Sequence, residues 1–234
     1  MNKKRILAIS DIHGHYDTLV KLLDYAEYNK DTDQLIILGD LCDRGTQNMA
    51  TLFYARELQK DGAIVLMGNH DKVAIGMMDE GINGEFGLDS QLHVYRINGK
   101  NTHEEFMKLS DLDKKIARNF LRSLPLYYQH DKYIFVHSGV NANKPLEDNT
   151  EDEILWSRDK FYFNEAYEDK IVVFGHTPVK YLNIEGTNRI WFDDVYEDKI
   201  GIDCGCFFTG IMGCLEIDLE TGKYMTYYID EEEE

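Results

Sequence analysis

The sequence has little cysteine, only three prolines and no long apolar run. Its four cysteines are too few and too closely grouped for a disulfide framework in a chain of 234 residues, so we expect buried free thiols. The pair Cys204-Gly-Cys206 lacks a second pair and is only a weak indication of a soft metal site. No apolar stretch is long enough to cross a bilayer, and no apolar signal-peptide region follows the basic N-terminus. These absences predict a cytoplasmic protein with no membrane partner.

Positive charge is also scarce. The 25 Lys and Arg residues face 43 Asp and Glu residues, which gives a formal net charge of −18. This sign disfavours binding to the nucleic-acid backbone, which depends on clustered Lys and Arg. It also repels phosphorylated substrates at long range, so a phosphate site would need local positive charge. The acidic residues 230–234 are predicted to form a solvated tail.

Apolar runs and helical patterns alternate in the first third of the chain. Strands are predicted at 6–9, 35–38 and 63–67, with helices at 17–29 and 47–60 between them. This alternation implies parallel strands with helical crossovers. A mainly helical inserted segment is predicted at 72–124. Further strands are predicted at 133–136, 171–174, 190–192 and 200–202, with a hairpin at 212–229. We therefore expect an α/β protein with a single domain over residues 1–229.

Five of the predicted strands end in Asp, Asn or His, usually beside a glycine. These residues are Asp11, His13, Asp40, Asp43, Asn69, His70, His137 and His176. In open α/β sheets the carboxyl ends of the strands are where ligands bind, because the loops converge there. Among them, two Asp, three His and one Asn would form a set of metal ligands of intermediate hardness, suited to Mn, Fe or Zn. Six ligands suit two ions that share a carboxylate, as in two-metal phosphoester hydrolysis.

These motifs resemble those of a known family. Residues 11–14 (DIHG), 39–45 (GDLCDRG) and 68–71 (GNHD) look like the three signature blocks of the PPP-type phosphoprotein phosphatases, which are calcineurin-like metallophosphoesterases. Residues 137–139 (HSG) and 175–178 (GHTP) match its two downstream histidine motifs. The likeness is closest to small bacterial and phage serine/threonine protein phosphatases, with symmetrical diadenosine tetraphosphatases as near relatives. It implies the fold of that superfamily, a central β-sandwich flanked by helices.

The resemblance also implies a role for each matching residue. It places one metal ion on Asp11, His13 and Asp40. It places a second on Asp40, Asn69, His137 and His176, so that Asp40 bridges the two. It makes His70 the general acid, oriented by Asp43, and assigns the phosphate to Arg44 and Arg158. The implied cofactors are two divalent metal ions, with Mn preferred and Fe or Zn as alternatives.

Other polar residues near the motifs have plainer explanations. Asp71 stands where the eukaryotic proteins of this family have Glu, and we expect it to support the ligands rather than to bind metal. His15 is predicted to cap the helix that follows it. His93, His103 and His130 are predicted to lie on the surface.

The predicted function is a metal-dependent phosphomonoester hydrolase, first of all a serine/threonine protein phosphatase with phosphoprotein or phosphopeptide substrates. The alternative is a symmetrical diadenosine tetraphosphatase or another small phosphoester hydrolase. A non-catalytic metal-binding scaffold is a remote alternative, since no ligand or acid is missing. A nucleotide hydrolase would need an aromatic or arginine platform in segment 72–124. That segment offers Phe86, Tyr95 and Arg96, but its glycines and methionines suit an open groove for varied partners.

Overall fold

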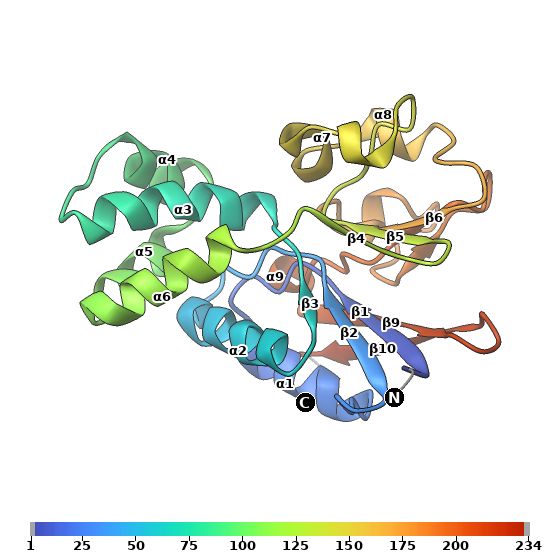
Figure 1. The fold of residues 1–234 in the computed structure, drawn as a ribbon, viewed down its shortest axis with the longest axis horizontal. Helices are drawn as coiled ribbons and strands as arrows, with labels where there is room; N and C mark the ends of the chain where they lie inside the picture. The colour runs from blue at the N-terminus through green and yellow to red at the C-terminus, as the bar shows by residue number, and fades with distance from the viewer. Residues whose placement is uncertain (1–2, 232–234) are drawn as a thin grey trace.

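Two mixed β-sheets pack face to face in the computed structural model, which describes residues 3–231 (Figure 1). The first sheet has the strand order β10-β9-β1-β2-β3, and the second has the order β4-β5-β6-β8-β7. Helices α1 and α2 cover the outer face of the first sheet, and α7 and α8 lie over the second (Figure 1). The result is the helix-flanked β-sandwich that the family resemblance implies.

The first sheet is built on parallel strands joined by helical crossovers. Its strands are β1 (Arg5–Ile9), β2 (Asp33–Ile37), β3 (Ile64–Val65), β9 (Ile211–Asp218) and β10 (Tyr224–Asp230). Helices α1 (Tyr16–Tyr25) and α2 (Asn48–Lys60) connect the three parallel strands, while the predicted hairpin β9–β10 joins β1 in antiparallel pairing. Two predicted elements are too long. α1 ends at Tyr25 because Glu27 has a left-handed φ of 51°, and β3 is short because the Met67 amide donates to Pro125 instead of to β2.

The second sheet contains one strand that the sequence did not indicate. Its members are β4 (Tyr127–His130), β5 (Tyr133–Val136), β6 (Ile171–Phe174), β7 (Trp191–Phe192) and β8 (Lys199–Gly201). β4 lies at the edge of the sheet and is only partly buried, so it lacks the apolar run by which the others were recognised. Short helical elements lie along the chain between the strands of this sheet: α7 (Glu151–Leu155), α8 (Asp159–Tyr162) and two 3₁₀ turns (Leu146–Asp148 and Val179–Tyr181). A further short helix, α9 (Cys206–Thr209), contacts β9 of the first sheet.

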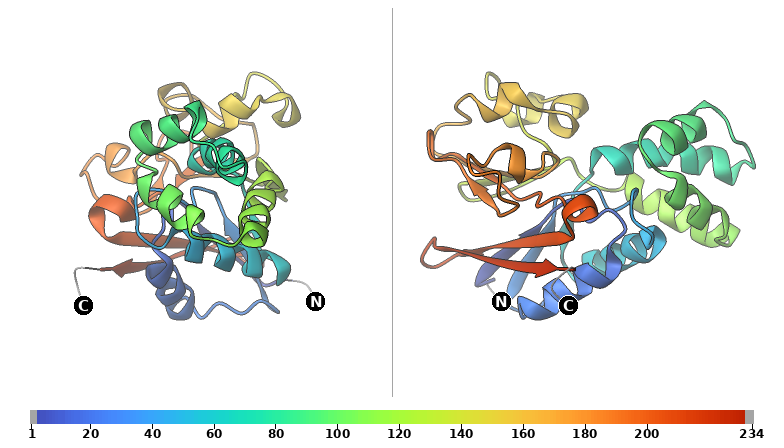
Figure 2. Two further views of the ribbon diagram at one scale, coloured as in Figure 1. Left: turned by 90° about the vertical axis from the view of Figure 1, so that its left-hand side faces the viewer. Right: turned by 180° about the vertical axis from the view of Figure 1, so that it is seen from behind.

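Four helices form a group beside the sandwich (Figure 2). They are α3 (Asn69–Ile82), α4 (Leu88–Arg96), α5 (Lys100–Met107) and α6 (Asp111–Arg122). α3 begins directly at the third strand-end motif, because the Asp71 carboxylate accepts hydrogen bonds from the amides of Gly68 (3.1 Å) and Leu41 (3.0 Å). Asp71 thus supports two of the motif loops at once.

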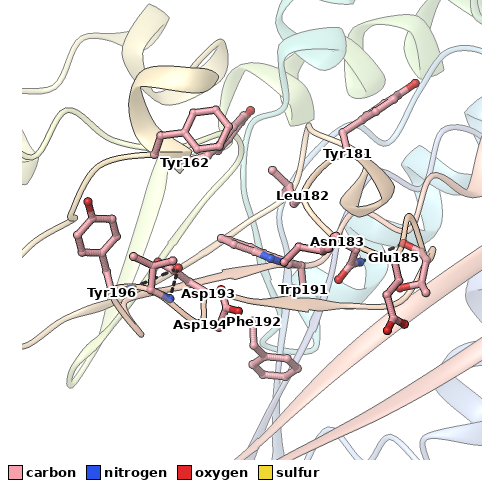
Figure 3. A pocket seen from close by; sticks show the side chains of 14 residues that line it. Tyr162, Tyr181, Leu182, Asn183, Glu185, Trp191, Phe192, Asp193, Asp194 and Tyr196 are labelled. Carbon is pink, nitrogen blue, oxygen red and sulfur yellow. Dashed lines mark hydrogen bonds between the residues drawn. The ribbon is translucent and has the colours of Figure 1, made fainter.

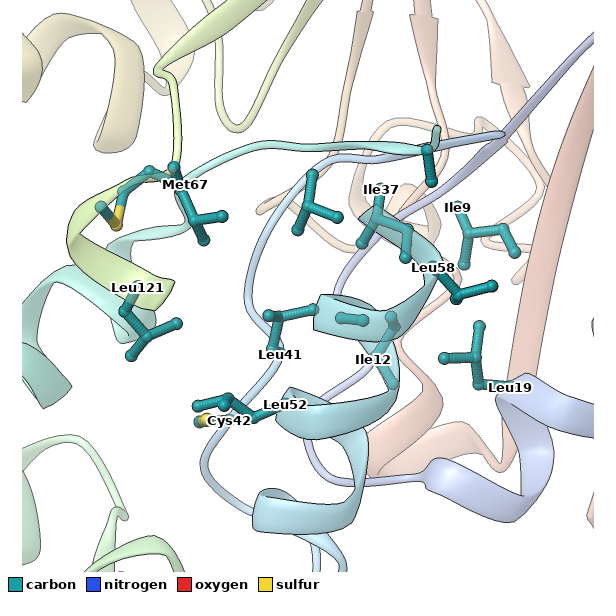
Figure 4. Packing of buried hydrophobic residues seen from close by; sticks show 14 of the residues in the cluster. Ile9, Ile12, Leu19, Ile37, Leu41, Cys42, Leu52, Leu58, Met67 and Leu121 are labelled. Carbon is teal, nitrogen blue, oxygen red and sulfur yellow. The ribbon is translucent and has the colours of Figure 1, made fainter. Parts of the chain in front are cut away.

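The core holds the strands that position those loops. Successive residues of β1 point to opposite faces: Leu7 and Ile9 belong to the cluster packed under α1 and α2, whereas Ile6 and Ala8 belong to the cluster between the sheets. Figure 4 shows Ile9 facing apolar side chains of both helices in the first cluster. Burying each such Leu or Ile contributes about 1.5–3 kcal/mol, so the strand ends rest on a rigid base.

The termini and the cysteines complete the comparison with the sequence. The four cysteines are buried free thiols, as predicted. Within residues 3–231, no helix is long and apolar enough to cross a membrane. The predicted solvated tail is partly wrong, because Asp230 ends β10 and the Glu231 carboxylate contacts Thr18 and lies 3.0 Å from Nδ1 of His15. That contact replaces the helix cap predicted for His15, and residues 232–234 lie outside the described residues.

Candidate metal centre

The loops at the strand ends are held together by their backbones. The amides of Asp11 and His13 donate to the carbonyls of Gly39 (3.2 Å) and Asp40 (2.9 Å), which aligns the first two motifs. The third motif presses against the second at Gly68, where an added Cβ would lie 2.1 Å from the Asp40 amide nitrogen. Only glycine permits so close an approach. The motif loops therefore meet at one point with little freedom to move apart.

Many site residues have left-handed backbone conformations. Their φ values lie between 48° and 76°, and the residues are Asp11, His13, Asp40, Asp43, Arg44 and His176. Such a conformation costs a residue other than glycine roughly 1–2 kcal/mol. It persists only where the surrounding structure fixes it, which is a common property of functional sites. Here it turns each side chain out of its strand direction and toward the shared point.

Acceptor atoms converge on one side of this point. Nδ1 of His137 donates to the Leu38 carbonyl (2.8 Å), which leaves a lone pair on Nε2. That Nε2 lies 2.8 Å from Oδ1 of Asn69 and 3.5 Å from Oδ1 of Asp40, and Nδ1 of His176 also lies 2.8 Å from the Asn69 oxygen. In the tautomer in which Nδ1 of His176 carries no proton, its lone pair converges with those of His137 and Asn69 on one point, where a cation can share them. The four side chains can therefore hold a metal ion.

A second set of acceptors lies on the other side of Asp40. Nδ1 of His13 donates to the Cys42 carbonyl (2.8 Å), and its buried Nε2 has no hydrogen-bond partner among the described residues. This Nε2 lies 3.5 Å from Oδ2 of Asp40 and 3.9 Å from Oδ1 of Asp11. Asp40 thus presents one oxygen to each set, as a carboxylate that bridges two metal ions would.

The centre also contains more buried negative charge than the protein alone compensates. Burial, together with the charges of Asp11 and Asp71, raises the pKa of Asp40 well above its usual range. Burial raises the pKa of Asp71 to about 6, and burial with the charge of Asp11 raises the pKa of Asp203. Burial conversely lowers the pKa of His176 to about 2, which keeps its ring neutral. Buried carboxylates beside neutral histidines are the chemistry of a divalent-cation site.

His70 lies next to the two acceptor sets but is engaged differently. The Asp43 carboxylate accepts from Nδ1 of His70 at 2.8 Å, and Arg44 donates to Nε2 at 3.1 Å. Burial opposes ionisation of Asp43, but hydrogen bonds and charge from His70 and His93 outweigh it and hold the pKa of Asp43 well below its usual range. Asp43 therefore stays ionised and fixes the His70 ring with Nε2 toward the cavity.

The position predicted for His93 is wrong, because this side chain is completely buried. Its Nε2 lies 2.8 Å from Oδ1 of Asp43. The Thr102 hydroxyl donates to the same oxygen (2.6 Å) and accepts from the Asp43 amide (3.0 Å). The sequence signal was present but polar: Ser90 and His93 are the two buried residues of α4 and have helical i, i+3 spacing. A search for apolar faces passes over such a pair.

A cavity of about 310 Å³ opens over the metal centre. Its walls carry three guanidinium groups, which come from three separate segments: Arg44, Arg96 and Arg158. The remaining lining residues are Asn69, His70, Ile97, Asn98, Trp156 and His176. Arg158 is fixed by a hydrogen bond to the Thr177 hydroxyl (3.0 Å), and the half-exposed Trp156 ring meets the His176 ring edge-on. The cavity is the local positive region that a phosphate group requires.

A larger cavity of about 510 Å³ lies behind α8 and has the opposite character (Figure 3). Aromatic side chains such as Tyr162, Tyr181 and Trp191 line it together with the carboxylates of Glu185, Asp193 and Asp194. Its lining, as far as the structure describes it, includes no Lys or Arg. Acidic walls repel phosphate, so the phosphoryl chemistry belongs to the smaller cavity.

The structure brings every predicted site residue to this centre or its cavity, and it adds one carboxylate that the sequence analysis missed. Asp203 is buried directly beyond β8, and its Oδ1 accepts from the Gly205 amide (2.8 Å). The rule used for the other strands, a polar residue directly after an apolar run, would also have found it.

The sequence pattern of the calcineurin-like phosphoesterases matches residues 4–203. The symmetrical bis(5'-nucleosyl)-tetraphosphatase of Methylococcus capsulatus is 33% identical over 139 residues, which cover 58% of this chain and 43% of that protein. The protein of the same name from Psychromonas ingrahamii is 33% identical over 146 residues, which cover 59% of this chain and 45% of that protein. The chain thus matches less than half the length of each relative.

Solved structures share the fold at low sequence identity. A protein provisionally described as a diadenosine tetraphosphatase superposes with a TM-score of 0.67 and 18% identity, covering 97% of this chain and 94% of that one. A protein serine/threonine phosphatase from Saccharomyces cerevisiae superposes with a TM-score of 0.66 and 13% identity, covering 97% and 80%. These structures indicate the fold only, while the sequence match covers most of the chain. The chain belongs to the calcineurin-like phosphoesterase family.

Proposed function

We propose that this protein is a metal-dependent hydrolase of dinucleoside polyphosphates. The observation that carries the proposal is the third arginine, Arg96, at the cavity over the metal centre. A phosphomonoester has a single phosphoryl group, which Arg44 and Arg158 suffice to hold. A polyphosphate chain presents further phosphoryl groups, and one of these gives the Arg96 guanidinium a partner. The name shared by the two relatives, symmetrical bis(5'-nucleosyl)-tetraphosphatase, supports the same choice.

The wall of the cavity also supports a nucleotide substrate. Of the platform residues considered in segment 72–124, Phe86 packs edge-on against His103 and Tyr95 is exposed outside the cavity lining. Arg96 lines the cavity, and Trp156, from a separate part of the chain, adds a half-exposed indole to its wall. An exposed indole face can stack a nucleobase, which typically contributes about 1–3 kcal/mol. Arg96 is thus the one platform residue named for segment 72–124 that lines the cavity, and Trp156, from outside that segment, supports the proposal with an aromatic face.

In this proposal each side chain at the centre has a specific task. Asp11, His13 and Asp40 hold one divalent ion, and Asp40, Asn69, His137 and His176 hold the other. When bound, the two ions supply Lewis acidity to the phosphoryl oxygens and an activated water as the nucleophile, with Mn preferred over Fe or Zn. Arg44 and Arg158 orient the reacting phosphoryl group. When Nε2 of His70 carries a proton and Arg44 turns from it to the phosphoryl group, His70 gives that proton to the leaving oxygen, and Asp43 keeps the ring in that orientation.

A second candidate is the serine/threonine protein phosphatase favoured by the sequence analysis. Its specific support is the 175–178 motif (GHTP), and the yeast phosphatase shares the fold. The metal ligands and the first two arginines would serve both reactions equally. Only the walls of the cavity would distinguish the two substrates, and Arg96 and Trp156 in these walls favour the dinucleoside polyphosphate.

The test is a comparison of kcat/KM for diadenosine tetraphosphate and for a phosphothreonine peptide, both measured with the Mn-loaded protein. We expect a value at least about tenfold higher for the dinucleotide, which corresponds to about 1.4 kcal/mol. Arg96→Ala should lower kcat/KM for the dinucleotide by a similar factor and leave that for 4-nitrophenyl phosphate unchanged. Arg56→Ala, on the partly exposed face of α2, is the matched control. An equal or higher value for the peptide would overturn the proposal.

A further inference from the structure

Asp43 is held from two sides, by His70 at the start of α3 and by side chains of α4 and α5. One carboxylate oxygen, Oδ2, accepts from His70. The other, Oδ1, lies 2.6 Å from the Thr102 hydroxyl and 2.8 Å from Nε2 of His93. Asp43, His93 and Thr102 are all completely buried. The Thr102 hydroxyl donates to Oδ1, and the His93 ring packs against the same oxygen without an aligned hydrogen bond among the described residues, so together they restrict rotation of the carboxylate.

The surrounding backbone shows that this arrangement is built rather than incidental. The amide of Gly99 donates to the His93 carbonyl (3.0 Å), and a Cβ on Gly99 would lie within 2.3–2.6 Å of the His93 ring atoms. Glycine at this position is therefore required for the ring to reach Asp43. The amide of Arg44 donates to the Asn98 carbonyl (3.2 Å), which fixes the turn between α4 and α5 directly onto the second motif loop.

A further contact strengthens the attachment of α5. The Glu105 carboxylate accepts from the Met49 amide (2.8 Å) and from the Asn48 side chain (2.7 Å) at the start of α2. Asn101 donates to the Gly45 carbonyl (2.9 Å) on the same side. Thr102 is thus placed by three neighbouring contacts of its own helix rather than by its own hydrogen bonds alone.

We propose that His93 and Thr102 are positioning residues for the general acid, acting through Asp43 on the orientation of His70. The proposal rests on the role assigned to His70 in the proposed function. Without the Thr102 hydroxyl and the His93 ring, Oδ1 of Asp43 is a buried acceptor with no partner, a state with a desolvation cost. Asp43 relieves that cost by rotating or by binding the His70 proton differently. Either change weakens proton delivery to the leaving oxygen.

On this proposal, helices α4 and α5 support proton transfer as well as substrate choice. The loss should therefore depend on the leaving group. Phenyl phosphate has a poor leaving group that needs the proton, whereas 4-nitrophenyl phosphate needs it less. A role in substrate binding alone would instead change KM and would affect both esters equally.

The experiment measures kcat for both esters with the Mn-loaded full chain. Thr102→Val keeps the shape of the side chain and removes the hydroxyl, and we expect kcat for phenyl phosphate to fall about 10- to 100-fold. The loss for 4-nitrophenyl phosphate should stay within about threefold. His93→Leu should lower kcat for the two esters by the same factors. Thr102→Ser restores the hydroxyl and should recover most of the activity, while metal content stays at the wild-type value throughout.

A double-mutant cycle separates this proposal from the one on which it depends. In a His70→Asn background, Thr102→Val should have no further effect, because the acid through which it acts is gone. His103→Ala is the control, since His103 follows Thr102 on the same helix and packs against Phe86. If His70→Asn is selective for the poor leaving group but Thr102→Val matches wild type, the positioning role is overturned. If His70→Asn shows no selectivity, the assignment of the acid and this inference both fail.

Discussion

The strand-end loops and the helices α3–α6 contribute to the same site in different ways. The loops contribute backbone geometry: four of the six assigned ligands, Asp11, His13, Asp40 and His176, occupy left-handed conformations, and Gly68 presses against Asp40. The helices contribute single side chains from ordinary helical backbone, namely His93, Arg96 and Thr102. Chemistry encoded in a loop leaves a contiguous motif in the sequence. Chemistry encoded on a helix leaves isolated residues whose partners are known only after folding.

The comparison is tested most severely at Asp40, the residue on which both acceptor sets depend. We expect Asp40→Asn to lose most bound metal and nearly all activity, because a neutral amide cannot bridge two cations. Metal analysis and kcat for the Mn-treated protein measure this. Asp79→Asn, which replaces a partly exposed carboxylate on α3 that pairs with two arginines, is the control and should retain both. Full activity in chelator-treated wild-type protein would contradict the two-metal assignment.

The next effect concerns His70, where a loop and the first of the four helices meet. We expect His70→Asn to keep both metal ions and to lower kcat by roughly 10²- to 10⁴-fold for poor leaving groups, because only proton delivery is lost. The measurement combines metal content with kcat for phenyl phosphate. A collapse of metal content would instead identify His70 as a ligand, because a nitrogen of its ring lies within 4.8 Å of the ligand atoms of His13 and Asp40.

A smaller effect concerns the pH dependence of the loops in the metal-free protein. The pKa of His176 is about 2 when folded, against about 6.5 when unfolded, so the unfolded chain binds the extra proton between these values. The contribution of His176 to the free energy of unfolding is therefore fully present above pH 6.5 and is lost as the pH falls. From pH 7.5 to pH 5 the loss should be about 2 kcal/mol.

Urea unfolding of wild type and His176→Asn at both pH values isolates this contribution. The raised pKa of Asp71 acts in the opposite direction in both proteins, since its folded form binds a proton more readily, and it cancels in the difference. The variant should therefore lose about 2 kcal/mol less than wild type on acidification. Equal losses would show that His176 remains free to take up a proton when folded.

The smallest expected effect concerns the stability of helix α6 alone. The Ser110 hydroxyl caps α6 by accepting from the Asp113 amide (3.1 Å). Ser110→Ala should cost about 1 kcal/mol, and lower Tm by about 2–4 °C, because an amide at the helix start loses its partner. Thermal unfolding measures this, and kcat should not change. A fall in kcat would indicate that the helices act on the site through their stability and not through named side chains.

The strands and motif loops could be predicted because each leaves a local pattern. The apolar run of β1 reflects burial on both faces, and the Asp, Asn and His that follow the strands reflect the edge where ligands bind. Buried polar residues on helices could not be predicted in the same way. The partner of His93 is Asp43, fifty residues earlier in the chain, and the local signal of its burial is a polar one, the i, i+3 spacing from Ser90.

The turn between α4 and α5 limits how freely the four helices could be exchanged. A segment that chooses substrates is often treated as a replaceable module, to be grafted from one relative onto the frame of another. Here the graft would also have to supply the Asn98 carbonyl for the Arg44 amide, Gly99 beneath the His93 ring, and the His93 and Thr102 side chains that contact Asp43. On our proposal, a chimaera that brought a new binding wall without these four groups would gain a new specificity and weaken the orientation of the general acid that serves it.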